Sequence, residues 1–392
     1  MKIALVVQRY GRQVVGGSET LARNIAERLA ASGHQVTVFS TTALDYVSWR
    51  HELPVGESLL RGVRIRRFKA AEERDIASFN SFSEKFFSLA PAERDEQEWL
   101  CRQGPFCPDL LAAIAAEQNE YDLFFFFTYL YHPTVAGLDL VRKPAVLFPT
   151  AHDEAPLYLG LMKEVFSRPE LLFFLTAAEM ELVRRVFHPA GRMELLRTGL
   201  DIPARADDRE VRRRYALYGP YVLYAGRIER GKGLETVFSS FLELADGRHL
   251  TLALIGKKLM DLPAHPAVRH LGFVSEEEKA ALFRGARFSL QPSPLESLSI
   301  TTLESFSQAT PVLVNGLCPA LLEHVEASGG GLAYRDAAEF SSAFLRLLAE
   351  PNKSRQMGCN GLDYVRRNFS WPVVMNRLES ACRELAAAAP NC

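Results

Sequence analysis

The stretch from Gln291 to Asn315, QPSPLESLSITTLESFSQATPVLVN, shows how the second half of the chain folds. Its centre predicts a helix, because Ile300, Leu303 and Phe306 recur at the three-to-four-residue spacing of an amphipathic helix. The residues on either side, ARFSL ending at Leu290 and VLV after Pro311, each predict a short buried strand. A strand–loop–helix–strand order is typical of a parallel sheet, and open α/β folds bind ligands where parallel strands end.

Two carboxylates, Glu296 and Glu304, stand on this predicted turn from loop to helix. Thr301-Thr302-Leu303-Glu304 fits a capping box, in which Glu304 would only satisfy the helix terminus. Because Ile300 already lies on the apolar face, we favour a helix that begins earlier and leaves Glu304 more than a turn inside. The start of such a helix presents backbone N–H groups suited to phosphate, from Leu298, Ser299 and Ile300.

Length and composition limit the classes of protein to which the chain can belong. At 392 residues it predicts two domains, and 48% hydrophobic residues suffice for two packed cores. A net charge of −1 lacks the basic excess of a general nucleic-acid binder. The six cysteines form no CxxC pair, which favours free thiols over a disulfide framework or a zinc site: Cys101, Cys107, Cys318, Cys359, Cys382 and Cys392.

The N-terminal run MKIALVV ends at Gln8-Arg9 without a cleavage pattern, so it predicts a first buried strand and not a signal peptide. The apolar run Leu123 to Phe127 is too short to span a bilayer. We therefore expect a soluble, cytoplasmic protein, and peripheral contact with the inner face of a membrane stays open.

Strand and helix alternate along the first half of the chain. A helix is predicted after Gly16-Gly17, with Ser18 as its N-cap and Gly33 at its end. Residues 70–107 interrupt this rhythm with scattered aromatic residues and predict an insertion that packs over one face of the first domain. The predicted strands are Ile3–Val7, Val36–Phe39, Val63–Phe68, Leu123–Phe127, Ala145–Phe148, Leu171–Leu175 and Met193–Leu196.

The alternation restarts after a predicted linker near Pro203, with a polar helix from Asp207 to Tyr215. The strand Tyr221–Ala225 leads into the loop Gly226-Arg227-Ile228-Glu229-Arg230-Gly231-Lys232-Gly233. In this loop Arg227 and Lys232 place two cations at the start of a helix, which suits a diphosphate. Taken alone, the loop is equally consistent with an ordinary solvated surface.

These residues together resemble a known family. The spacing E-x7-E of Glu296 and Glu304, preceded by PSP, and the pattern G-R-x4-K-G of Arg227 and Lys232 are similar to those of the large family 4 of retaining nucleotide-sugar glycosyltransferases. The loop at Gly16 and Gly17 and the closing Phe369-Ser370-Trp371 are also similar. The resemblance covers the whole chain and is strongest from Tyr221 to Asn315.

The resemblance implies the α/β architecture called GT-B, in which two Rossmann-like domains face each other across a cleft. The expected domains are an acceptor-side domain of residues 1–203, to which a last helix at 371–392 returns, and a donor domain of residues 204–370. By this likeness Arg227 and Lys232 hold the donor diphosphate, Glu304 the ribose and Glu296 the transferred sugar. The stereochemistry, with retention, also comes from the resemblance.

Further site residues follow from the same likeness. His152, in the run FPTAHDEAP after a strand, is expected by this likeness to face the donor sugar, although a lone histidine is more often a structural hydrogen-bonding residue. From the sequence alone, Asp153 fits an N-cap for the next helix. Phe273 and Val274 stand where the family's backbone meets the nucleobase, although Phe273 fits a core position equally well. Ser299 departs from the family, which usually has glycine there, and predicts a less permissive loop. Leu298 also replaces a usual aromatic residue.

The basic segment Arg61–Lys69 admits two interpretations. It could contact phospholipid or an anionic acceptor, but alternating Val63, Ile65 and Phe68 favour an ordinary half-exposed strand.

The predicted function is transfer of a hexose from a nucleoside diphosphate sugar to a saccharide or lipid-linked saccharide, in cell-surface polysaccharide or glycan synthesis. No metal and no cofactor beyond the donor are expected. The alternatives are a GT-B phosphorylase, an epimerase, or a non-catalytic nucleotide-sugar sensor.

Overall fold

The computed structural model describes residues 1–201, 203 and 207–388. The chain forms two compact units. The first contains Met1–Leu175, Glu179–Leu196 and the segment from Met375 onward, and the second contains Thr176–Ala178 and Arg197–Val374. The domain boundary predicted between residues 203 and 204 falls beside residues 202 and 204–206, which lie outside the described residues, so that boundary stays a prediction.

The first unit contains, in its described part, an eight-stranded sheet in the order β3-β4-β2-β1-β5-β6-β7-β8. All neighbours are parallel except the edge pair β3–β4. The sequence did not predict β3, because its residues GESLL are mostly exposed and lack an apolar alternation. The strands are β1 Lys2–Val6, β2 Gln35–Thr41, β3 Gly56–Leu60, β4 Val63–Phe68, β5 Leu123–Phe127, β6 Ala145–Phe148, β7 Leu171–Phe174 and β8 Arg192–Leu195.

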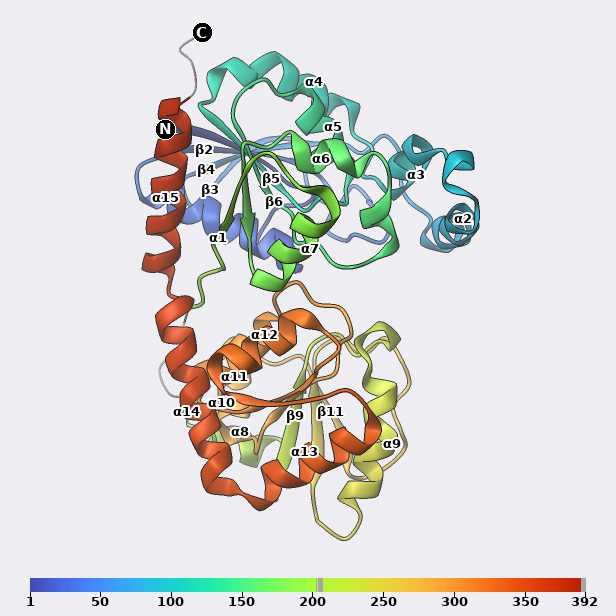
Figure 1. The fold of residues 1–392 in the computed structure, drawn as a ribbon, viewed down its shortest axis with the longest axis vertical. Helices are drawn as coiled ribbons and strands as arrows, with labels where there is room; N and C mark the ends of the chain where they lie inside the picture. The colour runs from blue at the N-terminus through green and yellow to red at the C-terminus, as the bar shows by residue number, and fades with distance from the viewer. Residues whose placement is uncertain (202, 204–206, 389–392) are drawn as a thin grey trace. The chain divides into compact units, whose positions relative to one another are not determined.

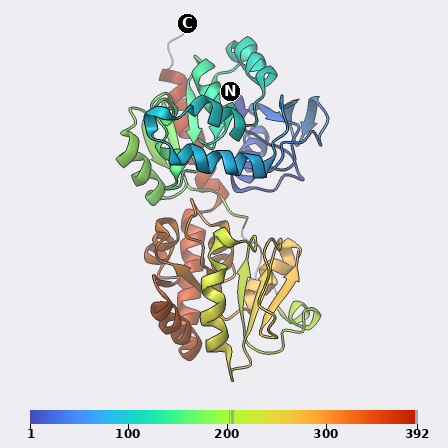
Figure 2. The ribbon, with the colours of Figure 1, turned by 90° about the vertical axis from the view of Figure 1, so that its right-hand side faces the viewer.

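Aromatic residues build much of the core of this unit. Every residue of β5, LFFFF, is buried, as expected for a central strand of a sheet covered on both faces. The predicted insertion at 70–107 folds into two helices whose Phe86 and Trp99 join that core, and Figure 2 shows these blue-green helices across the first unit. The helices are α1 Gly17–Ala31, α2 Ile76–Ser88, α3 Glu96–Gln103, α4 Pro108–Glu117, α5 His132–Leu140, α6 Met162–Ser167 and α7 Ala177–Phe187.

The second unit contains, in its described part, a six-stranded parallel sheet in the order β11-β10-β9-β12-β13-β14. Val222 and Tyr224 pack into one apolar cluster, while Leu223 and Ala225 pack into another. Because successive strand residues point to opposite faces, both faces of this sheet are covered by helices (Figure 1). The strands are β9 Tyr221–Ala225, β10 Thr251–Ile255, β11 Val268–Gly272, β12 Ser289–Gln291, β13 Val312–Asn315 and β14 Gly331–Tyr334.

Helices of the second unit follow its strands, as predicted for a Rossmann-like arrangement, except that β10 leads to β11 without a helix between them. The last helix, α15, enters the first unit from Met375 onward, and there Glu384 pairs with Arg192 of β8. The helices are α8 Arg209–Arg214, α9 Leu234–Ala245, α10 Glu276–Gly285, α11 Ile300–Ser307, α12 Pro319–Ser328, α13 Ala337–Ala349, α14 Pro351–Asn368 and α15 Trp371–Ala388.

Two findings concern the whole described chain. Its five cysteines are all free thiols, and Cys392 lies outside the described residues. Among the helices that the structure describes, none combines the length and the apolar character that crossing a membrane requires.

Candidate active site

The loop between β9 and α9 lies directly against the segment that follows β12. Gly233 adopts a φ of 71°, and a Cβ atom there would stand 2.4 Å from the carbonyl oxygen of Pro292. Only glycine allows both this left-handed conformation and so close an approach. Gly226 is approached in a similar way, since a Cβ on Gly256 would lie 2.1 Å from its carbonyl oxygen. The two sequence patterns are therefore neighbours in the fold.

Lys232 and Glu296, one from each pattern, form an ion pair. Their Nζ and Oε1 atoms are 2.6 Å apart, and the side chains are 22% and 21% exposed. An ammonium has three N–H donors, so the contact with Glu296 leaves two for the oxygens of a ligand. The half-buried position strengthens such contacts relative to bulk water.

Arg227 adds a second cation to the same loop. Its Nη2 lies 3.1 Å from Oε1 of Glu229, and its carbonyl oxygen accepts a hydrogen bond from the hydroxyl of Tyr224. The backbone of Arg227 is thus held by the buried Tyr224, while its side chain is partly exposed and can reach a ligand.

Glu304 lies inside α11 and not in a capping box, because the helix begins at Ile300 with Ser299 as its N-cap. Its Oε1 accepts a hydrogen bond of 2.7 Å from Nζ of Lys279 on α10. Its Oε2 is buried and has no hydrogen-bond partner among the described residues. Burial raises the pKa of Glu304, and the Lys279 ammonium opposes this rise.

Sequence reasoning missed Lys279. It follows three glutamates in SEEEKAALF, where it reads as an ordinary exposed helix residue. Burial works to lower the pKa of Lys279, but the carboxylates of Glu304 and Glu276 outweigh this effect, and its pKa is raised. The only sequence signal for Lys279 was its spacing on α10. It stands three residues after Glu276 and four before Phe283, the spacings at which helix side chains are neighbours.

The start of α11 is strained. Ser299 has a φ of 63°, a left-handed conformation that glycine adopts more readily. Its hydroxyl lies 3.0 Å from that of Thr302. Within the described chain, no group accepts a hydrogen bond from the backbone N–H of the residues at this turn, which are Leu298, Ser299 and Ile300. That these N–H groups bind phosphate stays a prediction.

His324 is a second residue that sequence reasoning missed. It is fully buried on α12, and its Nε2 donates to the carbonyl oxygen of Leu298 at 2.6 Å. Burial lowers the pKa of His324 to about 4, so the ring is neutral at physiological pH. The other nitrogen, Nδ1, therefore accepts from the hydroxyl of Tyr364. This chain of hydrogen bonds holds the turn before Ser299.

Phe273 follows β11 and is 80% exposed, so the interpretation of this residue as plain core is wrong. Gly272 before it has a φ of 80°, which turns the chain sharply at the end of the strand. Val274 instead packs against the apolar cluster beneath the sheet. The chain thus presents an aromatic ring to solvent beside a carboxyl end of the parallel sheet.

In the first unit, Gly16 is the N-cap of α1, so the prediction of Ser18 as N-cap is wrong. A Cβ on Gly16 would lie 2.1 Å from Oε2 of Glu19. Glu19 is buried in an ion pair with Arg9 beneath the loop. A Cβ on Gly17 would meet no atom within 4 Å, so the backbone there is open to approach. A side chain at position 16 would therefore displace the carboxylate of Glu19 from its place in the ion pair.

His152 lies in the same unit, between β6 and a short 3-10 turn. Its Nδ1 is 3.8 Å from Oε1 of Glu154, which also accepts from the hydroxyl of Tyr129. Asp153 does not cap the turn, because Glu154 is its N-cap. Asp153 instead accepts from the hydroxyl of Tyr158. Glu154 thus contacts both His152 and Tyr129, a role that the sequence did not suggest.

The second unit brings together Arg227, Lys232, Glu296 and the turn at Ser299. The sheet architecture of both units is that of the GT-B fold. Residues 219–350 match the family model described as Glycosyl transferases group 1. We therefore classify the chain as a glycosyltransferase with the GT-B fold.

Curated relatives match the chain over most of its length, and solved structures share its fold. The chain is 24% identical to the glycogen synthase of Mycobacterium tuberculosis, over 95% of this chain and 92% of that protein. It is 22% identical to an uncharacterized glycosyltransferase of Methanocaldococcus jannaschii, over 81% of each. The sucrose-phosphate synthase of Thermosynechococcus elongatus superposes with a TM-score of 0.76 at 20% identity, covering 99% of this chain and 100% of that one. Anabaena HepE in complex with UDP-glucose gives 0.70 at 16% identity, covering 98% and 100%.

Proposed function

We propose that the protein is a retaining glycosyltransferase of family 4, which transfers a hexose from a nucleoside diphosphate sugar to a saccharide or lipid-linked saccharide. The observation that carries this proposal is the contact between Lys232 and Glu296. It joins a cation and a carboxylate close to the start of α11, and both a cation and a helix N-terminus suit phosphate. The complex of Anabaena HepE with UDP-glucose supports a donor of this class.

Each side chain then has a chemical task. Arg227 and Lys232 bind the diphosphate and stabilise the negative charge that develops on it as it leaves. Glu296 accepts hydrogen bonds from hydroxyls of the transferred sugar. Glu304 has a buried oxygen without a partner among the described residues, which suits the ribose hydroxyls. The exposed ring of Phe273 offers a surface for the nucleobase.

The reaction we propose breaks the bond between the anomeric carbon and the diphosphate oxygen, and forms a bond from that carbon to an acceptor oxygen on the same face. The acceptor proton passes to the leaving phosphate. His152 would contact the donor sugar. The two cations of the loop supply the positive charge at the diphosphate, so we propose that neither a metal nor a cofactor is required.

The acceptor side follows from the same proposal. Acceptor recognition would involve the first unit, with Gly16 and Gly17 at its glycine loop. We propose a cytoplasmic location, at the inner face of the membrane when the acceptor is lipid-linked, and a role in polysaccharide or glycan synthesis.

The test is incubation of the protein with UDP-, GDP-, dTDP- and ADP-sugars, followed by thermal shift and by slow release of the nucleotide. One nucleotide should stabilise the protein, and its sugar should be hydrolysed at an equal rate with and without EDTA. Proton NMR of the first product should show the anomeric configuration of the donor. Absence of stabilisation by every nucleotide sugar would contradict the proposal. Binding without turnover, even with added cell glycans, would instead identify a sensor.

A further inference from the structure

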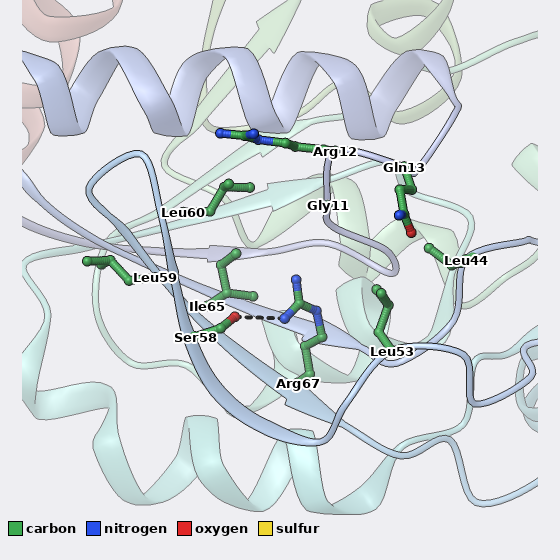
Figure 3. A pocket seen from close by; sticks show the side chains of 10 residues that line it. All are labelled: Gly11, Arg12, Gln13, Leu44, Leu53, Ser58, Leu59, Leu60, Ile65 and Arg67. Atoms are coloured by element: carbon green, nitrogen blue, oxygen red, sulfur yellow. Dashed lines mark hydrogen bonds between the residues drawn. The ribbon is translucent and has the colours of Figure 1, made fainter.

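A pocket of about 270 Å³ lies in the first unit, whereas the residues assigned to the diphosphate belong to the second. Gly11, Arg12 and Gln13 of the loop after β1 form one side of the pocket (Figure 3). The opposite side comes from the β3–β4 hairpin, through Ser58 and Arg67. The volume is close to the lower limit of small-molecule sites and is sufficient for a ligand of the size of one sugar.

Arg67 occupies a position where the strand pattern calls for an apolar residue. In β4 the residues Val63, Ile65 and Arg67 are buried, and Arg64 between them is exposed. The predicted alternation of Val63 and Ile65 is thus confirmed, but Arg67 takes the next inward position in place of Phe68. Only 8% of Arg67 is exposed. An unpaired buried charge is costly, and natural proteins rarely retain one without a partner.

No carboxylate compensates Arg67 within the described chain. The other arginines of β4 are paired, since Arg64 contacts Glu57 and Arg66 contacts Glu117. Among the described residues, Arg67 donates only to neutral groups, the hydroxyl of Ser58 at 2.7 Å and the carbonyl oxygen of Tyr10 at 3.3 Å. These contacts use two of its five N–H donors, and its Nε has no partner among the described residues. Burial lowers the pKa of Arg67, but a guanidinium stays charged at physiological pH.

The other charged residue of the lining is also positive. Arg12 is the second cation of the pocket, and Figure 3 shows it on the side opposite Arg67. None of the lining residues is acidic. The remaining walls are largely leucine and isoleucine side chains, so the two guanidinium groups are the charged groups of the lining.

We propose that this pocket binds a sugar-sized organic anion, with Arg67 contacting its phosphate or carboxylate group. A role of Arg67 in bracing the hairpin alone would not require a charge, because both of its present acceptors are neutral. The guanidinium suits either oxyanion through paired N–H···O contacts. The pocket shares no residue with the donor site and goes beyond the proposed transfer reaction.

The test measures binding to the full-length protein by calorimetry, without nucleotide sugar. The probes are glucose 6-phosphate, glucuronate, inorganic phosphate and neutral glucose. At least one of the two sugar anions should bind, and glucose should not. The comparison of glucose 6-phosphate with glucuronate identifies the preferred oxyanion. Failure of both sugar anions to bind, or equal binding of glucose, would overturn the proposal, as would binding of inorganic phosphate alone, which would indicate an adventitious ion.

Substitutions test whether the sugar anion binds in this pocket. Arg67→Gln should weaken the affinity about tenfold or more, the effect of losing a charged hydrogen bond. The matched control Arg64→Gln, on the exposed face of the same strand, should bind as the unmodified protein does. Lys232→Ala should also leave the affinity unchanged, which separates this site from the donor site. Unchanged affinity in Arg67→Gln would overturn the assignment.

A second variant covers the possibility that Arg67→Gln does not fold. A Cβ on Gly11 would lie 3.9 Å from Nη2 of Arg67, at ordinary contact distance from all its neighbours. Gly11→Ala should therefore fold normally and narrow the pocket beside the guanidinium. A reduced affinity for the sugar anion, at unchanged melting temperature, is the expected result. An affinity equal to that of the unmodified protein would contradict the proposed position of the ligand.

Discussion

Lys279 on α10 and Glu304 on α11 form an ion pair in which Nζ and Oε1 are 2.7 Å apart. Both side chains are largely buried, and Lys279, which also contacts the exposed Glu276, compensates the charge of Glu304. The pair fixes the carboxylate that we assign to the donor ribose, and it has a consequence for stability that depends on pH.

Replacing Lys279 by methionine should destabilise the protein by about 3 kcal/mol at pH 8 and by less than half of that at pH 5. Burial raises the pKa of Glu304 above its ordinary value of 4.5, and loss of the ammonium raises it further. A carboxyl group with a raised folded pKa contributes stability below its unfolded pKa and loses it as the pH rises toward the folded pKa. Urea unfolding at the two pH values measures the difference.

Two further variants serve as controls for this prediction. Lys279→Arg keeps the charge and should show a smaller effect. The double variant Lys279→Met with Glu304→Gln removes both charges and should recover part of the lost stability at pH 8. An equal loss in Lys279→Met at both pH values would show that Glu304 does not carry the effect.

Lys232→Ala should lower kcat/KM for the nucleotide sugar about 100-fold, which corresponds to about 3 kcal/mol of transition-state stabilisation. Steady-state release of the nucleotide measures this change. Arg230→Ala is the matched control, because Arg230 lies in the same loop with its side chain 85% exposed. Similar rates for the two variants would remove Lys232 from the diphosphate site.

Ser299→Gly should be more stable than Ser299→Ala by about 1 kcal/mol. Both changes remove the hydroxyl that contacts Thr302, so this loss cancels in the comparison. Only glycine relieves the left-handed conformation, with its φ of 63°. Chemical denaturation of the two variants gives the difference directly, and an alanine variant as stable as the glycine variant would show that the turn is unstrained.

Phe273→Ala should weaken nucleotide binding by about 1–3 kcal/mol, the usual effect of removing an aromatic ring that stacks on a base. The melting temperature should stay the same, because the ring is exposed and contributes little to the core. Calorimetry with the preferred nucleoside diphosphate measures the affinity. Tyr218→Ala is the control, since Tyr218 is 77% exposed in the same unit; an equal effect of both variants would argue against stacking.

Much of the fold could be predicted because it depends on local periodicity. The strands Val63–Phe68, Leu123–Phe127, Ala145–Phe148 and Tyr221–Ala225 have the predicted bounds. The helix that holds Glu304 begins at Ile300, as its apolar spacing indicates. The edge strand β3 could not be predicted in this way, because an exposed strand has no apolar alternation to reveal it.

The candidate site, like the fold, could be predicted from the sequence only in part. The sequence by itself determined the two patterns that contain Lys232 and Glu296, because residue type and spacing carry their chemistry. Only the tertiary structure decided which charges meet. Lys279 reaches Glu304 from another helix, Arg67 turns inward without a carboxylate among the described residues, and Phe273 remains in solvent. These outcomes depend on contacts between segments distant in the chain, and periodicity along a single segment carries no information about them.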